Sequence, residues 1–190
     1  MTQAGGFDPS PLTQAALSLG ARRAAIVRVS DIAFDRRFRA LCESNACGNY
    51  GRSWMCPPDV GEIDALIAAA QTYAHALVYQ SVGTLADSFD FEGMMAAAAR
   101  HNALAQRLSE VFPAYRFPRA RHRGAGGCRL CPACAKRTGE PCRHPARALA
   151  SLEAYGVDVS ALARLAGMPY INGKDTVTSF GAYLYCPPEN

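Results

Sequence analysis

The sequence lacks long hydrophobic runs and has few charges, and each shortage excludes a class of protein. Among its 190 residues no run of 18 or more is apolar, which argues against a transmembrane helix. The first ten residues carry neither a basic nor an apolar segment, so we expect no secretory signal and a cytoplasmic protein. The formal net charge of +4 is too small to indicate a nucleic-acid-binding protein.

Two other quantities are high, namely the hydrophobic content and the number of cysteines. Hydrophobic residues make up 49% of the chain and charged residues 19%, a balance that allows a buried core and excludes wholesale disorder. The eight cysteines, without a secretory signal, indicate metal or redox chemistry rather than disulfides.

Periodicity predicts strands that alternate with helices, which indicates a single α/β domain over residues 1–190. We expect a small central mixed sheet, flanking helices, two Cys-rich metal-binding loops and a mobile lead at 1–9. The predicted strands are 24–29, 75–80, 115–122 and 176–185. The predicted helices are 10–19, 32–41, 62–73, 91–111, 145–155 and 160–166, and 42–60 is predicted to be loop.

The stronger cysteine motif is Cys128-x2-Cys131-x2-Cys134, followed after seven residues by Cys142. Three cysteines at this spacing can wrap three corners of one cluster, as in the bacterial ferredoxin run. Zinc sites more often use two C-x2-C hooks with a longer spacer, and here the third cysteine comes too soon. The spacing favours a [4Fe-4S] cluster, while a zinc site remains the alternative, with His144 able to replace Cys142.

The other motif, which comes first along the chain, places Cys42, Cys47 and Cys56 in a polar loop rich in glycine, a poor environment for buried inert cysteines. Three thiolates can hold a [4Fe-4S] cluster and leave its fourth iron for another ligand. Cys186, in the second Cys-Pro-Pro of the chain, is the candidate eighth ligand. With it the cysteines divide four and four; without it they divide four and three, the arrangement we favour.

The combined pattern resembles a bacterial and archaeal family described as predicted metal-binding proteins. The resemblance runs from about residue 24 to 185 and rests on Cys42, Cys47, Tyr50, Gly51, Trp54, Cys56, Pro57, Pro58, Cys128, Cys131, Cys134, Cys142 and Pro145, with 152–159 and 178–181. It implies metal binding through the seven cysteines and brings no settled reaction. The chain departs from the pattern at Gly48, where a proline is expected, and Cys186 lies outside it.

Three functions fit these residues. The first is an enzyme that uses the open iron of a [4Fe-4S] cluster as a Lewis acid, for example to remove sulfur from a thiocarbonyl compound. Its small-molecule substrate would be anchored by Arg52, Asn172 and Lys174, chosen by residue type and loop position. The second is an electron carrier with two saturated clusters and a redox partner. The third is a structural zinc protein that acts through binding partners.

The basic residues allow a related interpretation. The run Arg116–Arg123 could contact RNA, but an anionic cluster or a substrate carboxylate attracts arginines equally well, and we expect neither a nucleic acid nor a membrane as partner. A four-thiolate [4Fe-4S] cluster carries −2 and a three-thiolate cluster −1, so two clusters would reduce the charge from +4 to about 0 or +1. The excess of arginine is therefore interpreted as compensation for anionic clusters.

Overall fold

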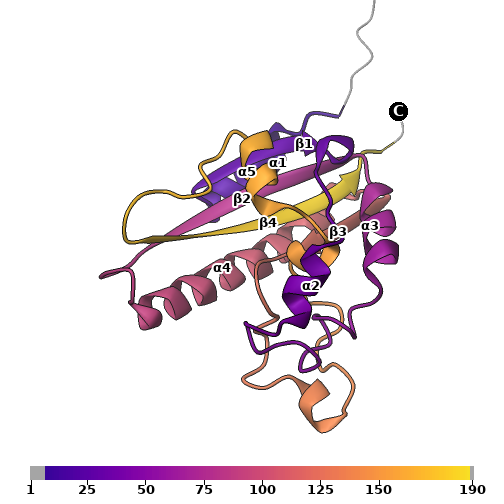
Figure 1. Ribbon diagram of the computed structural model, residues 1–190. Helices are drawn as coiled ribbons and strands as arrows, with labels where there is room; N and C mark the ends of the chain where they lie inside the picture. Colours follow the sequence, from indigo (N-terminus) through magenta and orange to yellow (C-terminus); the bar gives the residue numbers. More distant parts are fainter. Residues whose placement is uncertain (1–6, 189–190) are drawn as a thin grey trace, which may run out of the picture.

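The computed structural model describes residues 7–188 and contains one four-stranded sheet with five α-helices (Figure 1). The strands are β1 (Arg23–Arg28), β2 (His75–Thr84), β3 (Arg119–Arg123) and β4 (Thr176–Cys186). The helices are α1 (Ser10–Ser18), α2 (Phe38–Glu43), α3 (Ile63–Gln71), α4 (Phe91–Val111) and α5 (Val159–Leu165). Short 3-10 turns are η1 (Val29–Asp31), η2 (Phe112–Tyr115), η3 (Ala135–Thr138) and η4 (Glu153–Tyr155). The α/β class is confirmed.

The sheet has the strand order β1-β2-β4-β3, and all three pairings are antiparallel. The expectation of a mixed sheet was therefore wrong. Helix α4 does connect two strands, β2 and β3, that run in the same direction, as a βαβ unit requires. However, β4 lies between β2 and β3 and runs antiparallel to both. The two parallel strands are therefore not neighbours, and every pairing in the sheet is antiparallel.

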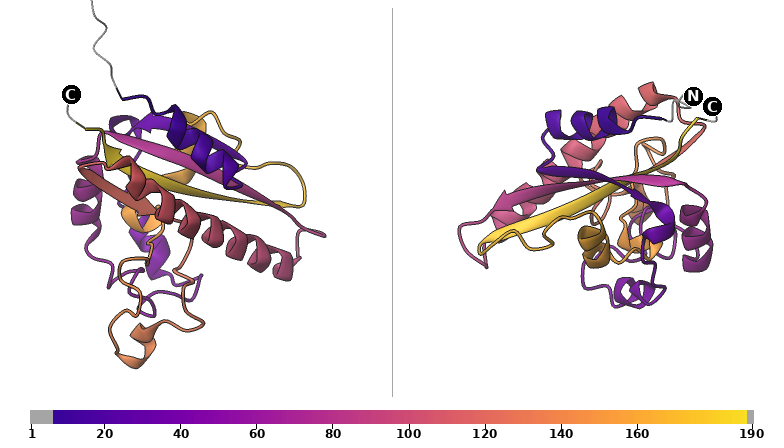
Figure 2. Two further views of the ribbon diagram at one scale, coloured as in Figure 1. Left: turned by 180° about the vertical axis from the view of Figure 1, so that it is seen from behind. Right: turned by 90° about the horizontal axis from the view of Figure 1, so that it is seen from above.

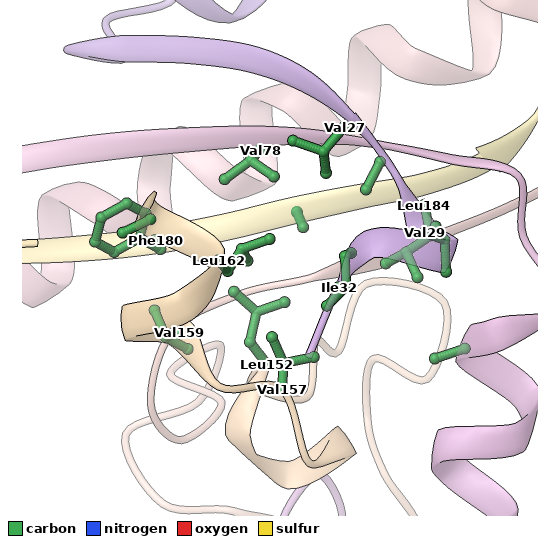
Figure 3. Packing of buried hydrophobic residues seen from close by; sticks show 14 of the residues in the cluster. Val27, Val29, Ile32, Val78, Leu152, Val157, Val159, Leu162, Phe180 and Leu184 are labelled. Atoms are coloured by element: carbon green, nitrogen blue, oxygen red, sulfur yellow. The ribbon is translucent and has the colours of Figure 1, made fainter. Parts of the chain in front are cut away.

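Helices cover both faces of the sheet, and the right view of Figure 2 shows α1 and α4 on one side and α3 and α5 on the other. Alternation along β4 divides the core: Phe180 and Leu184 pack with α5, whereas Tyr183 and Tyr185 pack toward α1 and α4. Figure 3 shows the first of these clusters, which includes Val27, Val29, Ile32, Val78, Leu152, Val157, Val159 and Leu162. Because β2 is central, its residues 76–80 are buried on both faces.

Helix predictions succeeded where the signal is local. Helix α4 has the predicted bounds, and the Asp90 carboxylate caps it by accepting a 2.8 Å hydrogen bond from the Gly93 N–H. The helix expected over 32–41 was wrong except for the short α2, because Phe34 forms a β-bridge with Val157. The helix expected over 145–155 was also wrong, since only η4 forms there.

The two ends of the described chain lie near each other, beside the end of β4. Most of the expected mobile lead, residues 1–6, falls outside the described residues. Phe7 packs its ring edge-on against Phe117 and Tyr185, at centroid distances of 5.2 and 5.9 Å. Within residues 7–188, none of the helices combines the length and the hydropathy needed to cross a membrane.

Candidate metal centre

Two segments that are far apart in sequence lie side by side below the sheet in Figure 1. We call residues 42–60 and 126–147 together the cysteine lobe. The Trp54 indole N–H donates a 2.9 Å hydrogen bond to the Glu140 carbonyl oxygen. Lys136 forms an ion pair with Asp59, and its Nζ lies 4.4 Å from the centre of the Trp54 ring. These contacts join the two segments into one unit.

Residues 150–158, which we call the strap, hold in place the two segments that lead into the lobe. We call these segments its arms. The arm that continues β3 is held at Gly124 and the arm that leads to α2 is held at 33–35. Four backbone hydrogen bonds do this: Gly124 N to Ala150 O (2.9 Å), Leu152 N to Gly124 O (3.1 Å), Asp35 N to Gly156 O (2.6 Å) and Asp158 N to Ala33 O (3.0 Å). The core under the strap thereby positions both cysteine motifs.

The second motif surrounds one small cavity. Cys128, Cys131, Cys134 and Cys142 all line it, together with His144 and Arg143. The lining contains no carboxylate, and all four thiols are free and partly buried. A set of four thiols is the donor set of either a [4Fe-4S] cluster or a structural zinc ion.

The first motif lies beside the second. Cys42 is in the last turn of α2, and Cys47 and Cys56 follow in turns; only Cys47 is exposed. Burial raises the pKa of the Cys56 thiol to about 11, and charges on Cys47, Cys42 and Cys128 act in the same direction. Cys56 therefore neighbours its own motif and also Cys128 of the other.

Burial and nearby hydrogen-bond donors shift the pKa values of the thiols in opposite directions. Burial raises the pKa of Cys42 and of Cys128, so both are protonated near neutral pH and would release a proton to a metal. Burial also acts on Cys134, but the backbone N–H groups of Lys136 and Trp54 outweigh it and hold the pKa of that thiol below its ordinary value. The backbone N–H groups of Leu130 and Leu149 also donate to Cys128, but there burial outweighs them.

Arginines stand close to thiols of both motifs. The Arg39 charge favours the thiolate of Cys42 one turn later on α2, and its buried Nε has no partner among the described residues. Arg143 lies close enough to Cys131 for that thiol's charge to act on it, and Arg137 acts likewise on Cys134. An unpartnered buried guanidinium nitrogen beside a thiol fits an anionic thiolate-bound group.

A single bound metal ion needs several ligands around one point. Among residues 7–188, no three His, Cys, Asp or Glu side chains are grouped as a metal-ion site. A tetrahedral zinc ion needs its ligands within about 2.3 Å of one point, whereas a four-iron cluster distributes its thiolates over four irons. The four thiols of the Cys128–Cys142 motif therefore fit a thiolate-bound metal group of either kind.

Of the other predicted site residues, one lies within the cysteine lobe and the rest lie elsewhere in the fold. Arg52 is exposed within the cysteine lobe. Cys186 pairs with Arg119 at the far end of β3, four residues or about 13 Å of strand from Arg123, and its Sγ lies 3.7 Å from the Thr72 carbonyl oxygen. The structure does not bring Cys186 to the other seven cysteines.

Asn172 and Lys174 lie in the connection before β4, at the opposite end of that strand from Cys186. Asn172 Nδ2 donates to Thr178 Oγ1 at 3.0 Å, so it holds its own loop together. The Lys174 ammonium lies 3.8 Å from the Asp175 carboxylate. The structure does not bring these two residues to the cysteines, because the loop extends away from the lobe along the β2–β4 pair.

The model of a family described as "Predicted metal-binding protein (DUF2284)" matches residues 25–185. The chain belongs to this family. The region common to the DUF2284 family contains all seven cysteines of the lobe and ends one residue before Cys186. Comparisons with curated proteins and with solved structures found no match. Membership establishes predicted metal binding in a cysteine-rich chain and leaves the metal to be determined.

Sequence reasoning missed two arginines of this DUF2284 protein. Arg39 could have been found from its spacing of three residues before Cys42 on a helix, which places both on one face. Arg123 was seen only as part of a basic run. The alternation of Arg119, Arg121 and Arg123 with period two was the available signal, because it predicts arginines on one face of a strand.

Proposed function

We propose that this DUF2284 protein carries a saturated [4Fe-4S] cluster on Cys128, Cys131, Cys134 and Cys142, and a second cluster with one free iron on Cys42, Cys47 and Cys56. One observation carries the proposal: seven cysteines lie in a single lobe as a set of four and a set of three, and Cys186 lies apart from them at the end of the inner strand β4. The set of three leaves one corner of a cluster without a thiolate.

The surroundings of the thiols support an anionic cluster. Arg39 and Arg143 place positive charge beside Cys42 and Cys131, and the backbone donates N–H groups to Cys134. Hydrogen bonds to cluster sulfurs and nearby charge are the means by which proteins stabilise such groups.

A cluster with a free iron supplies a Lewis acid that accepts a soft sulfur atom or an oxygen atom. The reaction we propose is desulfidation of a thiocarbonyl compound, in which water supplies an oxygen to the carbon and sulfur leaves as hydrogen sulfide, without net oxidation. In this chain Arg39 would hold negative charge at Cys42, and the Trp54–Lys136 stack would shield the junction between the two cysteine motifs from water.

Two alternative functions predict different results when the metal content is measured. An electron carrier with two saturated clusters needs an eighth thiolate, and Cys186 is the remaining cysteine. A structural zinc protein is favoured by one observation, that His144 lines the same cavity as the four thiols.

Metal analysis of the full chain tests the proposal. We expect anaerobically purified protein to be brown, with about seven to eight irons, matching acid-labile sulfide and no stoichiometric zinc. Cys131→Ser should lower the iron content by about half, and Cys186→Ala should leave it unchanged. Zinc without iron would contradict the proposal, and loss of iron in Cys186→Ala would favour the electron carrier. Sulfide or a thioamide should shift the EPR signal of one cluster in the wild type.

A further inference from the structure

A cavity of about 100 Å³ lies between α3, the strap and the edge strand β3. Its polar lining consists of Arg121 and Arg123 from β3, Tyr155 from η4 and Tyr73 from the turn after α3. Every other lining residue is aliphatic, and the lining contains no carboxylate. The cavity therefore combines positive charge with apolar walls.

The two arginines face this cavity because alternate residues of a strand share a face. Arg123 places its guanidinium 3.7 Å from the centre of the Tyr155 ring, and its Nη1 donates to the His122 carbonyl oxygen at 2.9 Å. Burial lowers the pKa of Arg123 to about 10, which leaves the group charged at neutral pH. Among residues 7–188, neither Arg121 nor Arg123 forms a salt bridge.

A largely buried guanidinium without a carboxylate partner is costly unless something else neutralises it. Its planar fork matches the two oxygens of a carboxylate. The aliphatic wall formed by α3, the strap and β4 suits an apolar body and would leave the outer oxygens of a phosphate without donors. The volume of about 100 Å³, set against about 30 Å³ for a water molecule, limits that body to a few non-hydrogen atoms.

We propose that this cavity binds a small organic carboxylate, with Arg123 and Arg121 holding the carboxylate and the aliphatic wall holding the body. Arg119 lies on the same face of β3 and serves a different purpose. Its Nη2 donates to Thr72 Oγ1 at 2.5 Å and its guanidinium lies 5.2 Å from the centre of the Tyr73 ring.

The cavity also adjoins the cysteine lobe. Tyr155 belongs to η4, whose Glu153 is close enough to act on Cys42, and β3 continues from Arg123 toward Cys128. A bound carboxylate would thus be the anchor of a substrate, the role first assigned to Asn172 and Lys174. This second step rests on the proposed function, whereas the binding itself does not.

Binding of simple carboxylates to the anaerobically purified full chain tests the proposal. Acetate, propionate, butyrate and inorganic phosphate are titrated at matched ionic strength, with binding followed by calorimetry and the iron content of each sample recorded. We expect saturable binding that strengthens about threefold or more from acetate to butyrate, and weaker binding of phosphate.

Four variants locate the site. Arg123→Gln and Arg121→Gln should weaken butyrate binding, the former about tenfold or more, and Arg119→Gln should stay within about twofold of the wild type. Ala69→Leu, at an exposed residue of the cavity wall, should weaken butyrate more than acetate because it fills the space, and it keeps the test valid if Arg123→Gln does not fold.

Three results would overturn the proposal: no saturable carboxylate binding, equal butyrate affinity in Arg121→Gln and the wild type, or phosphate binding as tight as butyrate and lost in the same variants. Normal carboxylate binding by a protein that contains zinc and no iron would refute the proposed function and leave this inference standing. A protein that contains two clusters but binds no carboxylate would refute this inference and leave the proposed function standing.

Discussion

The indole N–H of Trp54 donates a 2.9 Å hydrogen bond to the carbonyl oxygen of Glu140, 86 residues further along the chain. The same ring lies against the Lys136 ammonium, which pairs with Asp59. One aromatic side chain thus contacts the backbone and a charge of the opposite segment. The integrity of the cysteine lobe depends on a few such contacts, since it lies away from both hydrophobic clusters of the sheet.

Trp54→Phe should loosen the lobe, because it keeps a ring beside Lys136 and removes the hydrogen bond to Glu140. The loss is about 1 kcal/mol, so release of bound metal to a chelator should be about fivefold faster. Tyr50→Phe is the matched control, because its hydroxyl makes no hydrogen bond with the described residues. Equal release rates for the two variants would show that the Trp54 bond does not hold the lobe together.

The Lys136–Asp59 pair allows a double-mutant cycle. The side chains of Lys136 and Asp59 are 26% and 14% exposed, and Asp59 Oδ2 is buried without a hydrogen-bond partner among residues 7–188. Lys136→Met should lower the free energy of unfolding by about 3 kcal/mol, because it leaves a buried carboxylate unpaired. Adding Asp59→Leu should restore most of the loss in denaturant unfolding. Strictly additive effects would argue against a coupled pair.

Gly156 is the residue of the strap least open to substitution. Its φ is +71°, and a Cβ atom there would lie 2.9 Å from Ile67 Cδ1 and 3.2 Å from the Asp35 carbonyl oxygen. Gly156→Ala should destabilise the protein by about 2–4 kcal/mol through backbone strain and this clash. Gly167 has a φ of +66° and nothing within 4 Å, so Gly167→Ala should show only the backbone part, about 1–2 kcal/mol. Thermal unfolding would compare them.

Two buried histidines should make the protein less stable in acid. Burial lowers the pKa of His101 to about 4 and that of His122 to about 3, from 6.5. The unfolded chain binds these protons first, so stability is complete above pH 6.5 and falls as the pH drops toward 4 and then 3. Each histidine contributes a slope of at most about 1.4 kcal/mol per pH unit.

The measurement is denaturant unfolding between pH 7 and pH 4 with metal content checked at each point, because protonated thiols also release metal. His101→Gln keeps a hydrogen-bonding group near Ser81, the partner of His101 Nδ1 at 2.7 Å, and removes the titration. This variant should have a shallower slope than the wild type. Parallel slopes would rule out His101 as a source of the acid sensitivity.

The parts of the fold that the sequence predicted have local causes. Helix α4 follows from its own periodicity and Asp90 cap, and β4 from a run of β-branched and aromatic residues. The segments 33–35 and 150–158 could not be predicted, because backbone hydrogen bonds between them outweigh their helical patterns. The insertion of β4 between β2 and β3 is likewise a pairing that no local pattern specifies.

In the candidate site, too, the features with local causes were predicted and those that depend on contacts between distant segments were not. The spacing of Cys128, Cys131 and Cys134 alone predicted one set of ligands, since short steps keep cysteines together, and the three thiols do line one cavity. The proximity of Cys56 to Cys128 depends on the strap and on the Trp54 contact, which join residues far apart in sequence. The same holds for the Arg123 cavity, whose walls come from three separate segments. Asn172 and Lys174 were chosen by residue type alone, and distance along β4 separates them from the lobe.

The position of β4 also determines when the cysteine lobe can take shape during synthesis. Strand β3, which carries one arm of the lobe, pairs with β4, and β4 follows all seven cysteines of the lobe in the chain. While the ribosome has yet to make residues 176–186, β3 has no strand to pair with and the second motif is not anchored to the sheet. All seven thiols of the lobe are therefore synthesised before the sheet that positions them is complete.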